Sequence, residues 1–170
     1  MDEASLSLLP SVHRTYSKKA STPVLKNRSK YSQLSIASAI SEKGRIFYEV
    51  RQCNFKGNAI VRFLRNLLKG LRKKITIIWD GATCHICGEV KAFLKTPQGQ
   101  NVWLEKLPAY APELNADEQV WNYLKNVQLK NTCCKNAKEL KSVAILKLEE
   151  MKNNPKLIKK FFKHPEVAFV

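Results

Sequence analysis

The sequence predicts a single α/β domain in which helices flank a mixed sheet. Two stretches that alternate apolar and small polar residues, 31–40 and 45–50, are joined by a short link containing a glycine, as in a β-hairpin. A short, apolar, β-branched run at 75–79 is followed by alternating helix-like and strand-like segments. With 170 residues and 44% hydrophobic residues, the chain can build one buried core.

After the hairpin, the sequence predicts an amphipathic helix that begins at Asn58, a favoured N-cap residue, and runs to about Arg72. Apolar residues recur at three- and four-residue steps, and basic residues lie between them. The apolar positions are Ile60, Phe63, Leu64, Leu67, Leu68 and Leu71, and the basic ones are Arg62, Arg65, Lys69 and Arg72. The helix should bury one stripe and expose a basic face.

The second half of the chain predicts a strand, a helix and another strand. The run at 75–79 suits a strand buried on both faces that ends on Asp80. A short helix at 89–94 and a strand at 101–107 follow, and Pro108 closes this unit.

Further helices are predicted near the C-terminus. One begins at the cap residue Asn115 and buries Val120, Leu124 and Val127. Another begins with the pair Asn136 and Glu139, which resembles a capping box. It ends at 153–155, and the following LIKKFF segment predicts one or two more helical turns.

The charge of the chain points to nucleic acid. Its 30 Lys and Arg outnumber 14 Asp and Glu, giving a net charge of +16, which a polyanion or a solvated basic face must accommodate. Ribosomal, chromatin and membrane-surface proteins share this property, so charge alone does not decide the function. No apolar run is long enough for a membrane span and no secretory signal is present. We therefore expect a cytoplasmic protein without a membrane partner, with its five cysteines as thiols.

Two acids stand where α/β proteins usually place ligand sites. Asp80 ends the predicted core strand, and Glu118 lies in the first turn of a helix after a proline-rich loop. Mg²⁺ takes few carboxylates and keeps waters and substrate phosphate oxygens as its other ligands. Two such ions can activate an attacking oxygen and stabilise a leaving one.

The segments WDGATCH (79–85) and LPAYAPELNADEQVWNYLK (107–125) resemble the second and third acid motifs of the mariner-like DDE transposases, especially their bacterial insertion-sequence branch. The resemblance covers nearly the whole chain and implies an RNase-H-like fold. It also implies that Asp2, Asp80 and Glu118 are catalytic metal ligands for Mg²⁺ or Mn²⁺, with Asp117 as a neighbour of the third acid. Tyr16, Lys18 and Lys19, in the loop after the first acid, are the implied DNA contacts.

For the activity, the resemblance implies DNA strand cleavage and strand transfer at transposon ends. The implied partners are transposon-end and target DNA and a second copy of the chain.

The chain departs from the family pattern at two places. Ala116 replaces a proline, and Met1 stands immediately before Asp2, so we expect the first, central strand of the sheet to be largely missing. The domain at 1–170 would then be partial, without the family's N-terminal helix-turn-helix region. We expect marginal folding and an inactive or incomplete enzyme, unless an upstream-encoded portion supplies the rest.

Other interpretations compete with a metal-dependent enzyme. The chain could be a catalytically dead, basic nucleic-acid-binding fragment of a transposase, or the helix at 58–72 could bind a membrane surface or a calmodulin-type partner. Asp80 alone would suit a turn, and Glu118 alone would complement a helix dipole. Asp2 alone carries no signal, because the first residues of a chain are usually frayed.

Several other side chains also have two interpretations. His85 could assist near a metal or hydrogen-bond a loop. The pairs Cys84/Cys87 and Cys133/Cys134 are candidate zinc ligands, although their spacing is unusual for a zinc site. Trp79 and Trp121 suit core packing better than base stacking. The basic face of the helix at 58–72 could contact a phosphate backbone or be solvated.

Overall fold

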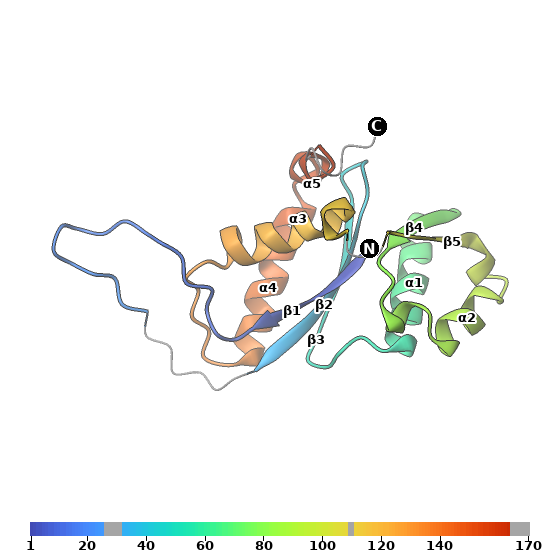
Figure 1. Cartoon of the computed structure of the whole chain (residues 1–170), viewed down its shortest axis with the longest axis horizontal. Coiled ribbons are helices and arrows are strands. Elements are labelled where there is room, and N and C mark those ends of the chain that lie inside the picture. Colours follow the sequence, from blue (N-terminus) through green and yellow to red (C-terminus); the bar gives the residue numbers. More distant parts are fainter. Residues whose placement is uncertain (26–31, 109–110, 164–170) are drawn as a thin grey trace.

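The computed structural model describes residues 1–25, 32–108 and 111–163, and within them it has the predicted α/β architecture (Figure 1). The strands are β1 (Asp2–Ser7), β2 (Gln33–Ile40), β3 (Ile46–Arg51), β4 (Ile75–Trp79) and β5 (Val102–Lys106). The helices are α1 (Gly57–Leu71), α2 (Gly88–Leu94), α3 (Ala116–Asn122), α4 (Ala137–Lys152) and α5 (Pro155–Phe161). Single 3₁₀ turns lie at Thr83–His85, Gly99–Asn101 and Pro112–Leu114.

The strands form two ladders that meet at the first residue of the chain. β1, β2 and β3 are antiparallel in that spatial order, and Asp2 pairs with Ser38. β4 and β5 are parallel, as two strands joined through a helix should be. The amino group of Met1 donates a 2.8 Å hydrogen bond to the carbonyl oxygen of Ile78, which links β1 to β4.

The first strand is longer than the sequence analysis expects. β1 begins at Asp2 and continues to Ser7, and it pairs with β2 over its whole length. The reason is that the residues after Asp2 alternate in their burial, with Leu6 buried and Ser7 exposed. Asp2 therefore lies in a strand, and the Met1 amino group forms the backbone hydrogen bond to β4.

The predicted hairpin is confirmed as β2 and β3. The first predicted residue, Tyr31, lies outside the described residues, and β2 begins at Gln33. The link between the strands needs Gly44, which has a φ of 83° and lies so close to Pro155 that a Cβ atom would approach its carbonyl oxygen to 2.6 Å. This contact holds the start of α5 against the hairpin.

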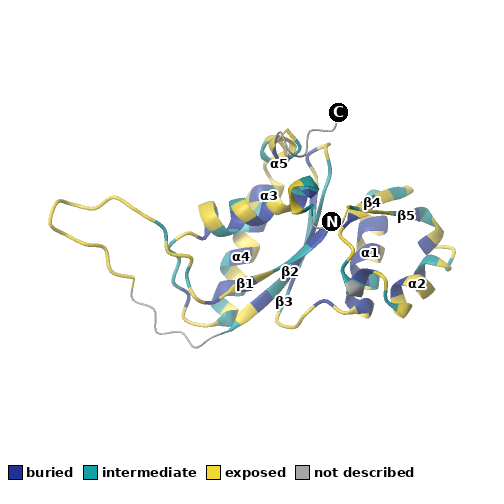
Figure 2. Ribbon diagram, viewed as in Figure 1, coloured by how far each residue is buried: buried dark blue, intermediate teal, exposed yellow. Residues whose placement is uncertain are grey.

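Each face of the β1–β3 ladder is covered by different helices (Figures 1 and 2). One face carries Leu34 and Ile36 and packs in a core with α3, α4 and α5. The other face carries Ala37, which belongs to a second core with α1, α2, β4 and β5. Because successive side chains of a strand point to opposite faces, Asp2 lies on the α3 side and Glu3 on the α1 side.

Helix α1 has the predicted buried stripe but a different start. Its N-cap is Lys56 without a side-chain cap, and Asn58 lies inside the first turn, so the predicted cap is wrong. The stripe, from Ile60 to Leu68, is buried in the second core. Because that stripe is occupied, α1 offers no apolar face to a membrane or a calmodulin-type partner. Within the described ranges, no helix is long and apolar enough to cross a membrane.

The predicted burial is wrong for one face of β4 and for Val127. β4 is covered on one face only: Ile77 and Trp79 are buried, whereas Ile78 is 55% exposed because α1 and α2 cover one side of this two-stranded ladder. Val127 is 49% exposed. It lies in a π-helical continuation of α3, Tyr123–Gln128, whose wider turn moves this residue off the buried face.

Candidate active site

Asp2 is a buried carboxyl group at the start of β1. Only 7% of the residue is exposed, its Oδ2 accepts a 3.0 Å hydrogen bond from the Trp121 indole, and its Oδ1 accepts a 2.8 Å bond from the Glu3 backbone N–H. Burial raises the pKa of Asp2 to about 6, and the charges of Asp117 and Glu118 act in the same direction against the two hydrogen bonds. Asp2 thus belongs to a group of carboxylates that repel one another.

The two acids at the start of α3 point into different surroundings. Asn115 caps the helix as predicted, since its side chain accepts a hydrogen bond from the Asp117 N–H. The Asp117 side chain is buried, where it accepts a hydrogen bond from Ser38 and lies 2.9 Å from the Met1 amino group. Glu118 is exposed. Glu118 is therefore the member of the pair that is accessible to a ligand.

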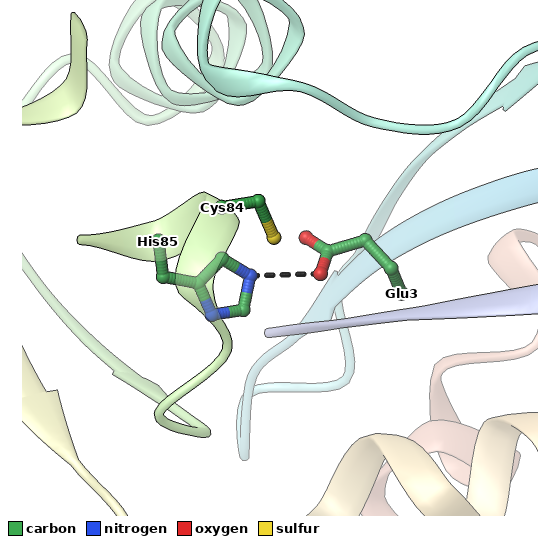
Figure 3. A group of neighbouring side chains, drawn as sticks. All are labelled: Glu3, Cys84 and His85. Carbon is green, nitrogen blue, oxygen red and sulfur yellow. Dashed lines mark hydrogen bonds and ion pairs between the residues drawn. The ribbon is translucent and has the colours of Figure 1, made fainter. Parts of the chain in front are cut away.

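The Asp80 side chain is held by His85, which also contacts Glu3 (Figure 3). The Nδ1 atom of His85 lies 2.8 Å from Oδ1 of Asp80, and its Nε2 atom lies 2.7 Å from Oε2 of Glu3. The imidazole is buried and stacks on Trp79, with ring centroids 4.3 Å apart. His85 therefore links the loop after β4 to the strand that carries Asp2.

These two partners raise the pKa of His85. Burial on its own lowers the pKa of His85. The hydrogen bond and charge of Glu3, followed by the hydrogen bond to the Asp80 backbone carbonyl oxygen and the charge of Asp80, outweigh it and raise the pKa. Since a carboxylate can only accept, an imidazole between two carboxylates donates from both nitrogens. His85 thus fixes the loop of Asp80, and its role near a metal stays a prediction.

The three predicted acids are connected to β1 in different ways. The charge of Glu118 acts on Asp2, whereas Asp80 is connected to β1 through His85 and Glu3. The ligand atoms of the three acids are not all within 4.8 Å of one another. The three acids therefore do not form one compact group of ligands.

A second group of potential ligands lies beside Asp80. Glu3, Cys84 and His85 offer three ligand atoms within 4.8 Å of one another, the one such group among the described residues (Figure 3). Burial, with the charge of Glu3 next, raises the pKa of Cys84 to about 11, which disfavours the thiolate that zinc needs. Cys87 donates to the Cys84 carbonyl oxygen and is not among the three grouped ligands.

The predicted DNA-contacting residues lie in the part of the chain at 11–25, after β1, which projects from the body of the protein (Figure 1). Tyr16, Lys18 and Lys19 are all exposed. The base of the segment is fixed by Asn131, whose side chain accepts from the His13 N–H and donates to its carbonyl oxygen. The three residues are separate from the acids and remain a prediction.

Two residues of the site were missed or undervalued by the sequence analysis. Glu3 was not assigned a role, although the alternation of a strand places it on the face opposite Asp2. Trp121 was interpreted as core packing, and it is 4% exposed, but it also donates to Asp2. A signal for this role was available, because Trp121 lies three residues after Glu118, on the same side of the helix.

Comparisons with known proteins identify the family and the fold. A family model described as DDE superfamily endonuclease matches residues 1–141. The fold is similar to that of a Mos1 transposase paired-end complex with the left transposon end and of a Mos1 mariner paired-end complex with Mn, each with a TM-score of 0.70 and 16% identity, covering 98% of this chain and 53% of the other. The catalytic domain of Mos1 mariner transposase matches with a TM-score of 0.60 and 15% identity, covering 86% of this chain and 76% of the other.

These likenesses establish the fold. The chain has the RNase-H-like fold of the Mos1 catalytic domain, and it spans about half the length of the Mos1 chains in the complexes. No curated protein sequence matches it.

Proposed function

Since the chain belongs to the DDE superfamily endonucleases, we propose that it is the catalytic core of a transposase that cleaves and joins DNA strands with divalent metal ions. The observation that carries the proposal is the carboxylate group around the start of β1, in which the buried Asp2 is affected by the charges of Asp117 and Glu118. Neighbouring carboxyl groups, one of them buried, are what a hard cation would stabilise.

In this proposal Asp2, Asp80 and Glu118 hold Mg²⁺ or Mn²⁺, which supplies activation of the attacking oxygen and stabilisation of the leaving oxygen. Mos1 mariner paired-end complexes are known with Mn and with Mg. Trp121 and the Glu3 backbone orient Asp2, while His85, itself bonded to Glu3, orients Asp80. No side chain needs to act as a nucleophile.

The proposed reaction has two steps at phosphorus. Water first attacks the phosphodiester at a transposon end, so that a new P–O bond forms and the 3′ oxygen leaves as a hydroxyl. That 3′-hydroxyl then attacks target DNA, and its P–O bond replaces one in the target strand. Because each core holds one set of acids, pairing two ends requires two copies of the chain.

The finer parts of the proposal rest on the sequence motifs. WDGATCH (79–85) and the segment 107–125 carry the assignment to the bacterial insertion-sequence branch. A role on transposon DNA places the chain inside the cell. Recognition of the transposon end is assigned to an upstream-encoded portion, because the resemblance leaves the helix-turn-helix region without a counterpart among residues 1–170.

Two measurements on the full chain test the function. Mn²⁺ binding, followed by loss of the free Mn²⁺ signal in electron paramagnetic resonance, should weaken in Asp80→Asn and Glu118→Gln and stay unchanged in Glu113→Gln, an exposed acid of the preceding turn. Mn²⁺-dependent nicking of supercoiled plasmid should follow the same order. An Asp80→Asn chain that binds Mn²⁺ and nicks like the wild type would contradict the proposal.

The alternative is a DNA-binding fragment without cleavage activity. It is favoured by one observation, that the three acids do not converge within 4.8 Å. A chain that binds duplex DNA, while neither Mn²⁺ binding nor nicking depends on Asp80, would establish this alternative.

A further inference from the structure

A strongly basic pocket lies at the end of α1, where this helix meets the turn before β5. Its volume is about 520 Å³, and no carboxylate lines it. Its cationic residues are Arg65, Lys69, Arg72, Lys73 and Lys74. None of these five forms an ion pair with any part of the chain that the structure describes. The side chains of Asn66, Gln98 and Asn101 add neutral hydrogen-bonding groups.

The pocket is separate from the candidate active site. Lys73 and Lys74 immediately precede β4, whereas Asp80 follows its last residue. A strand rises about 3.3 Å per residue, so the two ends of this segment are roughly 20 Å apart. The pocket and the acids thus lie at opposite ends of the same strand.

Two of the cations are held in place. The Arg65 guanidinium lies 5.5 Å from the centre of the Phe93 ring, a cation–π contact between α1 and α2. Arg72 has a φ of 52° at the end of α1, a left-handed conformation that usually belongs to glycine. A side chain is rarely kept at such a position without a reason.

The helix dipole explains only part of this arrangement. Cations near a helix C-terminus are stabilising, which accounts for Lys69 in the last turn of α1. It does not account for an arginine in the left-handed position, since glycine would end the helix with less strain. It also does not account for Lys74, which lies next to β4.

We propose that this pocket binds the phosphate backbone of duplex DNA, as a second contact remote from the acids. Five unpaired cations without a carboxylate match a polyanion, and the pocket is larger than a single phosphate group needs. Neutralised phosphates release counterions, which makes such a contact strong at low salt and insensitive to sequence. The choice of DNA over another polyanion rests on the proposed function.

The test measures binding of the full chain to a fluorescent 30-base-pair duplex in EDTA, at several KCl concentrations. The pocket variant is Lys69→Ala/Lys73→Ala/Lys74→Ala, and the matched control is Lys156→Ala/Lys159→Ala/Lys160→Ala on α5; all six lysines are exposed. Each phosphate contact contributes about 0.9 to the slope of log K against log salt. The pocket variant should lose about 2 to 3 from that slope and at least about tenfold in affinity, and the control should lose little.

A second variant separates binding from structure. Arg72→Gly removes a pocket cation and relieves the left-handed backbone, so it should bind DNA more weakly while its melting temperature stays the same or rises. A structural role for Arg72 predicts the opposite change in melting temperature.

Several outcomes would overturn the inference. They are equal losses in the pocket and control variants, no loss in either, no duplex binding by the wild type, or a pocket variant that loses binding to phosphatidylserine vesicles but not to DNA. Failure of the proposed function gives a different pattern, because duplex binding in EDTA would then depend on the pocket while Mn²⁺ binding would not depend on Asp80.

Discussion

Asp2 and Asp80 are predicted to share one task, yet they lie in opposite surroundings. Asp2 is buried and is held by two neutral donors, the Trp121 indole and the Glu3 backbone N–H. The Asp80 side chain is 50% exposed and is held by the charged imidazole of His85. The fold therefore disfavours the charged form of Asp2, whereas it leaves Asp80 half-exposed and in contact with a cationic partner.

The difference shows how two ligands of one site can be supported in different ways. A buried carboxylate without a cation costs folding free energy, which a metal ion would recover on binding. An exposed carboxylate loses little on folding, and it needs a partner that fixes its orientation. The β1 side of the site thus provides excess negative charge, and on the β4 side His85 fixes the orientation of the Asp80 carboxylate.

The largest expected effect comes from removing the buried charge. The pKa of Asp2 is about 6 in the folded protein and near 3.8 ordinarily, so between these values the folded state binds more protons and stability falls as pH rises. The difference corresponds to about 3 kcal/mol above pH 6. Asp2→Asn should therefore be more stable than the wild type by up to about 3 kcal/mol at pH 7.5, and by little at pH 4, in urea unfolding.

Asp80→Asn is the matched control for that prediction. It breaks the ion pair with His85 at a half-exposed carboxylate, so it should lower stability by about 1 kcal/mol or less. Destabilisation of similar size in both variants at pH 7.5 would show that the two carboxylates do not differ as described.

The next largest effect concerns the orientation of the Asp80 side chain by His85. The amide nitrogen of His85→Asn can replace Nδ1 and keep the bond to Asp80, whereas that of His85→Gln can replace Nε2 and keep the bond to Glu3. Both variants lose the stacking on Trp79. Residues that orient metal ligands typically contribute 10- to 100-fold to metal affinity, about 2 kcal/mol. His85→Gln should weaken Mn²⁺ binding by that factor, and His85→Asn should weaken it less.

Equal Mn²⁺ affinities in the two His85 variants would mean that the bond to Asp80 does not support metal binding. Circular dichroism melting of both variants serves as the control for folding.

Much of the fold follows from local signals in the sequence. The hairpin, the buried stripe of α1 and the caps at Asn115 and Asn136 depend on residues within a few positions of one another, and the structure confirms them. The exposed side of β4 could not be predicted, because it depends on which elements cover the sheet. The exposure of Val127 depends on a π-helical turn that ordinary helical spacing does not indicate.

The residues of the candidate site also divide into those that local motifs predict and those that only the fold brings together. The acids Asp80 and Glu118 were found through motifs, each within one short segment. The bridge between Glu3 and His85 joins residues 82 positions apart, and the bond between Asp2 and Trp121 spans 119 positions. Such pairs become visible only when the strand order and the packing of α3 are known.

The smallest expected effect concerns the hydrogen bond that the Trp121 indole donates to Asp2. Trp121→Phe keeps an aromatic ring in the core but removes the indole N–H that Asp2 accepts, which should cost about 1 kcal/mol, the usual net value of a hydrogen bond. Because the lost bond lowers the pKa of Asp2, its removal should also move the pH range of the stability loss upward. Trp79→Phe is the control on the Asp80 side, and it should leave that pH range unchanged.

In a double-mutant cycle with Asp2→Asn, measured by urea unfolding at pH 7.5, the free-energy cost of Trp121→Phe should shrink, since the charged acceptor is gone. A cost that is the same with and without the Asp2 charge would mean that Trp121 supports the core alone, and the two sides of the site would then differ only in exposure.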